Sequence, residues 1–176
     1  STPFQRVYFS DVADSFIENF QLADAIEQLP DSRFKVAAGG RLNWYINETF
    51  VIRTFYRYYY DDWGISSHTA SAEVPIKLSD KFTIYPSYRY YRQTAADYFN
   101  GYEEALSTDT FYTSDYDLSE YTANQLGMGV SYTDIFTKMH IWKLGLKSID
   151  LKFYKYDRDT TFSSSIITAG FKFVMD

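Results

Sequence analysis

The residues with the clearest chemical potential are charged side chains that recur at every second position of aromatic-rich segments. In the stretch RTFYRYYYDDWG, residues 53–64, Arg53 and Arg57 alternate with Thr54, Tyr56 and Tyr58. Because a strand places successive side chains on opposite faces, this spacing predicts one charged face and one apolar face. The same alternation along the chain gives the predicted charged set: Lys35, Arg41, Arg53, Arg57, Glu73, Lys77, Arg89, Asp150, Lys152 and Lys172.

This charged set is mostly basic, and two interpretations of it are open. Inside a barrel, a ring of one charge selects ions of the opposite charge, so the set would line a lumen and favour anionic solutes. Alternatively, arginine, tyrosine and carboxylate side chains pack into a ladder that stiffens the wall. The number of strands decides between the two, because eight-stranded barrels are filled by side chains whereas barrels of about 16 strands leave a channel.

The elements that must position these residues are strands. The alternation predicts eight of them, at residues 4–10, 33–46, 50–62, 66–78, 81–94, 121–133, 146–157 and 161–175. Pro86 falls inside one, where it removes a donor from the ladder and predicts a bulge or an edge. Gly39 and Gly40 also lie within a strand and predict a kink or close packing. The fold class predicted is all-β, an antiparallel up-and-down transmembrane β-barrel of about eight strands, complete or part of a larger barrel.

The connections between these strands alternate in length and charge. Segments 11–32 and 95–120 hold six and seven acidic residues and no lysine or arginine, whereas the whole chain has 17 bases and 23 acids. The dipeptides Asn47-Glu48 and Ser79-Asp80 are predicted tight turns at the opposite end of the strands. Long loops at one rim and short turns at the other are typical of outer-membrane barrels, as is an aromatic content of 20%.

The segment 11–29 has a different periodicity. Val12, Phe16, Phe20, Ala23 and Ile26 recur at three- and four-residue steps, which predicts an amphipathic loop helix inserted in the single domain 1–176. A helix packed on the barrel mouth is the plainer interpretation, and a helix that docks a partner is the other. The acidic loops as a whole are expected to contact envelope protein partners, while the lipid bilayer surrounds the strands.

Other chemistry has little support in the sequence. Asp109, Asp115, Asp117 and Glu120 are weak candidates for a divalent cation site, and solvated acidic loops are the plainer interpretation of them. The chain has no cysteine, and His68 and His140 are predicted to lie too far apart for one site. No catalytic residue, cofactor or nucleic-acid partner is therefore predicted.

Four blocks of sequence resemble a known family: PDSRFKVAAGGRL, FYRYYYDDWGISSHT, YPSYRYYRQTAADYF and the closing YKYDRDT with AGFKF. They are similar to an outer-membrane family of Gram-negative bacteria, common in Bacteroidota and known only as a domain of unknown function. The resemblance spans roughly residues 30–175, and family members are about twice this long and begin with a secretion signal. It implies an outer-membrane β-barrel of which this chain is the C-terminal part, with segment 11–29 as an insertion of its own, and it implies no activity.

The predicted function is therefore an outer-membrane barrel that acts as a solute channel or as a structural component of an envelope complex. The alternative is a soluble β-barrel or sandwich that binds a ligand, such as a lipocalin-like carrier or a lectin. The apolar face discriminates the two. In the membrane interpretation it is exposed to lipid, and in the soluble one it is buried; its test residues are Ile52, Ile76, Ile84, Val130, Leu151 and Phe171.

Overall fold

The computed structural model describes residues 6–11, 16–17, 20–21, 24–134, 136 and 140–175. These residues form an all-β structure with a single short 3-10 turn, η1 (Tyr116–Leu118). Within the described part of the chain, no helix is long and apolar enough to cross a membrane. The chain divides into two compact units: a loop unit of residues 1–37, 59–67 and 93–121, and a sheet unit of residues 38–58, 68–92 and 122–176.

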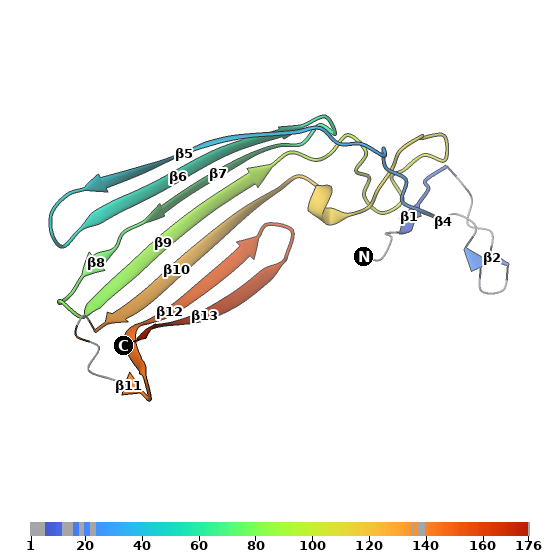
Figure 1. Ribbon diagram of the computed structural model, residues 1–176. Coiled ribbons are helices and arrows are strands. Elements are labelled where there is room, and N and C mark those ends of the chain that lie inside the picture. The colour runs from blue at the N-terminus through green and yellow to red at the C-terminus, as the bar shows by residue number, and fades with distance from the viewer. Residues whose placement is uncertain are drawn as a thin grey trace. The chain divides into compact units, whose positions relative to one another are not determined.

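One antiparallel sheet accounts for most of the regular structure, and its long strands lie side by side in chain order (Figure 1). They are β5 (Lys35–Tyr45), β6 (Val51–Asp61), β7 (Ser66–Glu73), β9 (Phe82–Gln93), β10 (Tyr121–Thr133), β12 (Leu144–Arg158) and β13 (Ser163–Met175). Two short strands join it, β8 (Ile76–Lys77) on β9 and β11 (His140–Ile141) on β12. The predicted strands from residue 33 onward are thereby confirmed, with ends that differ by a few residues.

Both tight turns predicted from the sequence, at Asn47-Glu48 and Ser79-Asp80, are present and stabilised by side-chain hydrogen bonds. At the turn between β5 and β6, the Asn47 side chain accepts hydrogen bonds from the backbone N–H groups of Thr49 and Phe50, each at 2.9 Å. At the next turn, Ser79 Oγ accepts from the N–H groups of Lys81 and Phe82. Short polar side chains stabilise tight turns in this way, which explains why both reversals are short.

Proline and glycine mark the irregular points of the sheet. Opposite Pro86 the neighbouring strand is interrupted between β7 and β8, and the Val74 N–H donates to the Pro86 carbonyl at 3.0 Å. A Cβ atom at Gly39 would lie 2.8 Å from the Tyr56 carbonyl oxygen, so the close packing predicted there is confirmed. At Gly40, in contrast, a Cβ atom would meet nothing within 4 Å.

The N-terminal segment departs from two predictions. Residues 6–8 form β1 (Arg6–Tyr8), but this strand pairs with β4 (Asp24–Ile26) in a separate two-stranded sheet, so the prediction that 4–10 is a strand of the main sheet is wrong for the described residues. The predicted helix over 11–29 is also wrong where it is described, since β2 (Phe16–Ile17), β3 (Phe20–Gln21) and β4 are strands. Val12 and Ala23 lie outside the described residues.

The physical reason for the second error is that a short helical periodicity is a weak signal. An isolated helix of this length is marginal in water and depends on tertiary packing. Here β4 instead finds a backbone partner in β1, whose Val7 is fully buried. Strand pairing thus satisfies the same backbone groups and buries an apolar side chain as well.

The two acidic loops pack against each other within the loop unit. Gln28 and Tyr112 exchange two backbone hydrogen bonds of 2.9 and 2.7 Å, and Thr113 Oγ1, fully buried, donates to the Glu27 carboxylate at 2.7 Å. Asp11 accepts two hydrogen bonds from Ser107, which hold the pKa of this exposed carboxyl below its ordinary value. The described residues of the two loops therefore pack together although they lie about 90 residues apart in the chain.

Candidate functional site

The charged face of the sheet unit is the first candidate site. Arg41, Arg53, Glu73 and Arg89 come from four neighbouring strands, β5, β6, β7 and β9, and line one open hollow of about 620 Å³. All four belong to the predicted charged set. Alternation along the strands therefore identified a group of side chains that the fold does bring together.

Contacts within this hollow pair only part of its charge. Arg53 Nη1 lies 3.0 Å from Glu73 Oε1, with side-chain exposures of 51% and 28%. The Arg41 guanidinium lies over the Phe55 ring, 5.3 Å from its centroid. An exposed ion pair contributes little to stability, so this pair is better understood as tuning the local charge than as holding the sheet together.

The rest of the predicted charged set is spread along the strands outside the hollow. Lys152 lies over the Tyr85 ring at 5.5 Å, and Lys77 pairs with Asp80 at 3.0 Å across the turn. Asp150 accepts a weak hydrogen bond from Ser148 at 3.4 Å. The three remaining members are exposed: Lys35, Arg57 and Lys172. The basic character thus extends along the face rather than forming a single ring.

Uncharged polar residues complete the lining of the hollow, and the predicted charged set does not include them. They are Asn43, Ser71, Ser87, Gln125 and Tyr154, together with the ring of Phe55. Their position on the same face follows from the strand alternation, so parity was the signal that would have found them. Gly127 makes room for this packing, because a Cβ atom there would lie 2.6 Å from the Tyr154 ring and clash with Ser87 Oγ.

The opposite, apolar face of the sheet is largely uncovered. Val130, Leu151 and Phe171 are 42%, 55% and 62% exposed, and Ile52, Ile76 and Ile84 are half-buried. None of the six test residues is buried, which differs from what a self-contained soluble sandwich requires.

Tyrosines gather near one end of this apolar face. Tyr56 and Tyr58 on β6 lie beside His68 on β7, and the Tyr56 hydroxyl is 2.7 Å from His68 Nδ1. On β9, the Tyr88 hydroxyl donates to Asn124 of β10 at 2.6 Å. At the other end of the strands the large apolar side chains include Trp44 and a Phe82–Tyr132 ring pair. Aliphatic residues lie between the two groups.

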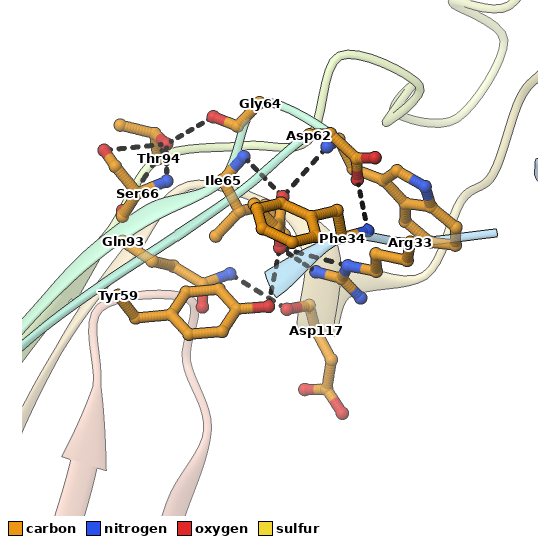
Figure 2. A network of polar contacts seen from close by, with 12 residues as sticks. Arg33, Phe34, Tyr59, Asp62, Gly64, Ile65, Ser66, Gln93, Thr94 and Asp117 are labelled. Atoms are coloured by element: carbon orange, nitrogen blue, oxygen red, sulfur yellow. Dashed lines mark hydrogen bonds and ion pairs between the residues drawn. The ribbon is translucent and has the colours of Figure 1, made fainter. Parts of the chain in front are cut away.

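A second polar cluster lies in the loop unit, around the DDWG motif that follows Tyr60 (Figure 2). The Asp61 carboxylate is fully buried and accepts five hydrogen bonds. Arg33 donates two, at 3.0 and 2.5 Å, and the Tyr59 hydroxyl donates one at 2.7 Å. The backbone N–H groups of Trp63 and Ile65 donate the others, at 3.0 and 3.1 Å.

These bonds decide the ionisation of Asp61. Burial raises the pKa of its carboxyl, but the hydrogen bonds from Tyr59 and Arg33, the Ile65 N–H and the Arg33 charge together outweigh burial. The net result is a pKa below the ordinary value of 3.8. Asp61 is therefore an ionised anchor. Because its two oxygens already accept five hydrogen bonds, the carboxylate is poorly suited to take a proton from a substrate as a general base.

The surrounding residues of the motif also have structural roles. Asp62 Oδ1 accepts from the Phe34 N–H at 2.9 Å, and the Arg33 guanidinium stacks on the Trp63 ring at 4.4 Å. Gly64 has a φ of +85°, a conformation that favours glycine. Nearby, the Gln93 amide donates to backbone carbonyls of Asp117 and Ser119. These contacts join the segment at Arg33 and Phe34 to the DDWG motif within the loop unit.

The weak metal candidates do not assemble into a site. Asp109 accepts from the Leu106 N–H at 3.1 Å, and Asp115 caps the turn η1 by accepting from the Asp117 N–H at 2.9 Å. Among the described residues, no three His, Cys, Asp or Glu side chains are grouped so as to hold a metal ion. The carboxylates of Asp109 and Asp115 each accept a backbone hydrogen bond within a loop turn, and the described structure does not group the four candidates Asp109, Asp115, Asp117 and Glu120 as a metal site.

Comparison with known proteins identifies a family and nothing further. A family model described as "Protein of unknown function (DUF3570)" matches residues 1–159. The matched range includes segment 11–29, and the expectation that this segment is an insertion of the chain's own stays a prediction. No curated protein and no solved structure matches the chain.

Proposed function

The chain belongs to the DUF3570 family, and from the geometry of its sheet we propose that it forms part of the wall of a β-barrel in the outer membrane of a Gram-negative bacterium. The resemblance noted in the sequence favours a host among the Bacteroidota. The charged face then lines an aqueous lumen that passes small anionic solutes. The protein is proposed to act without catalysis or a cofactor.

The observation that carries the proposal is the exposure of the apolar face. Leu151 sits in the middle of β12, between Val130 of β10 and Ala169 of β13, and all three are exposed. A band of such residues is stable where it contacts lipid, because lipid removes it from water as a protein core would. Strands of 11 to 15 residues are also long enough for a tilted crossing of the bilayer.

The tyrosine groups support the same assignment. Membrane interfaces favour tyrosine and tryptophan, whose rings are apolar and whose polar atoms can reach water or a partner. The hydroxyls of Tyr56 and Tyr88 are hydrogen-bonded to residues of neighbouring strands, His68 and Asn124. Their polar groups are therefore satisfied at the depth where hydration is incomplete.

Membrane insertion can be tested with two neighbouring substitutions that face opposite ways. Leu151→Arg places a charge on the apolar face, which costs about 2–4 kcal/mol near the middle of the bilayer. Lys152→Leu removes a charge from the other face and is the matched control. We expect Leu151→Arg to lower the fraction of protein that stays in carbonate-washed outer membranes, and Lys152→Leu to leave it unchanged. Equal behaviour of the two variants would overturn the membrane assignment.

Anion passage can be tested in planar bilayers with the barrel purified from native outer membranes. Arg89→Gln removes a cation from the hollow, and Lys155→Gln removes one from the apolar face, where Lys155 pairs with Asp157 at 3.5 Å. The ratio of chloride to potassium permeability should fall for the first variant and stay constant for the second. A protein that inserts but never conducts would refute the channel.

That last outcome would favour the second candidate function, a structural component of an envelope complex. The packing of the acidic loops into a unit with its own buried residues supports this candidate, because an ordered surface is what a partner protein can recognise. Co-purification of envelope proteins that is lost on acid-to-amide substitution in exposed loop positions such as Glu103 would support it.

A further inference from the structure

The described sheet ends in two strands that have a partner on one side only. β5 pairs with β6, and β13 pairs with β12, and within the described residues neither has a neighbour beyond. In an antiparallel ladder about half the residues of an edge strand direct their N–H and C=O groups outward. For β5 and β13, with 11 and 13 residues, this leaves roughly five or six residues on each edge with unpaired backbone groups.

Such edges are not stable inside a membrane. Hydrocarbon offers no hydrogen bonds, so every backbone donor and acceptor must be satisfied within the protein. On the proposed function, therefore, both edges are paired in the mature barrel. The direction of the two edge strands determines what can pair with them.

Both edge strands run the same way. β5 begins at the end of the sheet from which the long loops leave and finishes at the Asn47 turn. The strands then alternate in direction through β6, β7, β9, β10 and β12. β13 is antiparallel to β12 and thus parallel to β5, since an odd number of long strands lies in the described sheet.

We propose that the barrel is closed by a second β-segment of different sequence that contributes an odd number of strands. Neighbouring strands of bacterial outer-membrane barrels are antiparallel, so its two outer strands run opposite to β5 and β13, from the turn end to the loop end. Their residues alternate between an apolar side that continues the lipid-facing band and a polar side that continues the lumen. This inference rests on the proposed membrane function and adds the kind of partner that completes it.

A second copy of this chain cannot provide the antiparallel neighbours that β5 and β13 need. Copies inserted in the same orientation are related by rotation about the membrane normal, which preserves strand direction. Every contact between β5 or β13 of one copy and β5 or β13 of the next is then parallel. An antiparallel β5–β5 contact needs a twofold axis in the membrane plane, which places the acidic loops of the two copies on opposite sides of the bilayer.

Direct closure of β5 on β13 within one chain is disfavoured by charge. A barrel of eight or fewer strands is filled by side chains, with no room for water. The charged face would then enclose eight lysine and arginine side chains with Glu73 and Asp150 as the carboxylates of the predicted set. Unpaired charges in a dry interior cost several kcal/mol each. A wide lumen avoids this, and a total of about 16 strands would require about nine in the added segment.

Cysteine crosslinking tests the closure cleanly, because the sequence contains no cysteine. Gly40→Cys on β5 and Ala169→Cys on β13 each place a thiol at an exposed mid-strand position of the apolar face. Both single variants and the double variant are oxidised in native outer membranes and separated under non-reducing conditions. In parallel, hydrogen exchange of the β5 and β13 amides is compared with that of β9, which has a partner on each side.

The expected result is that no variant forms a disulfide-linked dimer or an internal crosslink, and that the edge amides exchange as slowly as those of β9. A dimer from Gly40→Cys alone would show β5–β5 pairing, and an internal crosslink in the double variant would show direct closure. Either crosslink, or fast exchange at both edges, overturns the proposal. The Leu151→Arg and Lys152→Leu pair reports insertion separately, so failure of the closure is distinguishable from failure of the proposed function.

Discussion

The buried carboxylate of Asp61 is expected to hold the loop unit together, and Asp61→Asn tests this with almost no change in shape. One oxygen of Asp61 accepts from Arg33 and Tyr59, and the other accepts from the N–H groups of Trp63 and Ile65. An amide keeps one acceptor and replaces the other with a donor. Whichever way it is turned, at least two donors lose their acceptor.

The size of the effect follows from these contacts. Each buried donor left without a partner costs about 1–3 kcal/mol. Removing one partner of a buried ion pair costs about 3–5 kcal/mol, and the Arg33 side chain is only 20% exposed. We therefore expect a local loss of about 3–5 kcal/mol, which corresponds to roughly two to four orders of magnitude in an opening equilibrium.

Hydrogen exchange at the Trp63 and Ile65 amides measures this opening directly. Asp61→Asn should speed exchange at both amides by about two to four orders of magnitude, while amides of β10 stay unchanged. Asp62→Asn is the matched control, because the Asp62 side chain is exposed and accepts one hydrogen bond from Phe34. If the two variants exchange alike, Asp61 is not the anchor and the reasoning from its contacts is wrong.

The same variant predicts a pH dependence with a definite sign. The folded-state pKa of Asp61 is lowered below 3.8, so its contribution is fully present above pH 3.8 and is lost as pH falls through the folded pKa. An asparagine has no such titration. The ratio of variant to wild-type exchange rates at one pH cancels the intrinsic pH dependence, and it should be constant above pH 3.8 and approach one in stronger acid.

Two glycines give further predictions. Gly64→Ala forces alanine into a positive φ, which costs about 1–2 kcal/mol, and puts a Cβ atom 2.6 Å from the Asp97 carboxyl carbon; loop exchange should increase. Gly127→Ala places a Cβ atom 2.6 Å from the Tyr154 ring, so about 1–3 kcal/mol of stability should be lost in urea denaturation. Gly40→Ala, with open space around it, should change neither measurement, and an equal loss at all three positions would contradict both predictions.

The sheet was predictable from sequence because its information is local. Strand alternation depends only on which residues are neighbours in the chain, and strong alternation runs through β6 and β10. Turn residues such as Asn47 and Ser79 are equally local, since each bonds to backbone two or three residues away. Alternation also grouped Arg41, Arg53 and Arg89 correctly, although they lie on three strands.

The loop unit was not predictable by the same means, because its contacts join distant segments. The β1–β4 pairing, the bonds between Gln28 and Tyr112 and the bond from Thr113 to Glu27 connect positions that no local pattern relates. The acidic composition correctly marked the segments as loops, but composition does not say which carboxylates are buried. No local pattern distinguishes Asp61 from its exposed neighbour Asp62, and the role of Asp61 as an anchor follows only from the contact with Arg33.

The strand β6 shows why charge and aromaticity occur together in this chain. Its residues face three surroundings in turn: Tyr56 and Tyr58 lie on the apolar face, Arg53 reaches Glu73 on the charged face, and Asp61 ends the strand in a buried cluster. Each side chain suits one surrounding, so exchanging neighbours should not be neutral even when composition is kept. The mixed character of the stretch therefore reflects a strand whose side chains meet three different surroundings along its length.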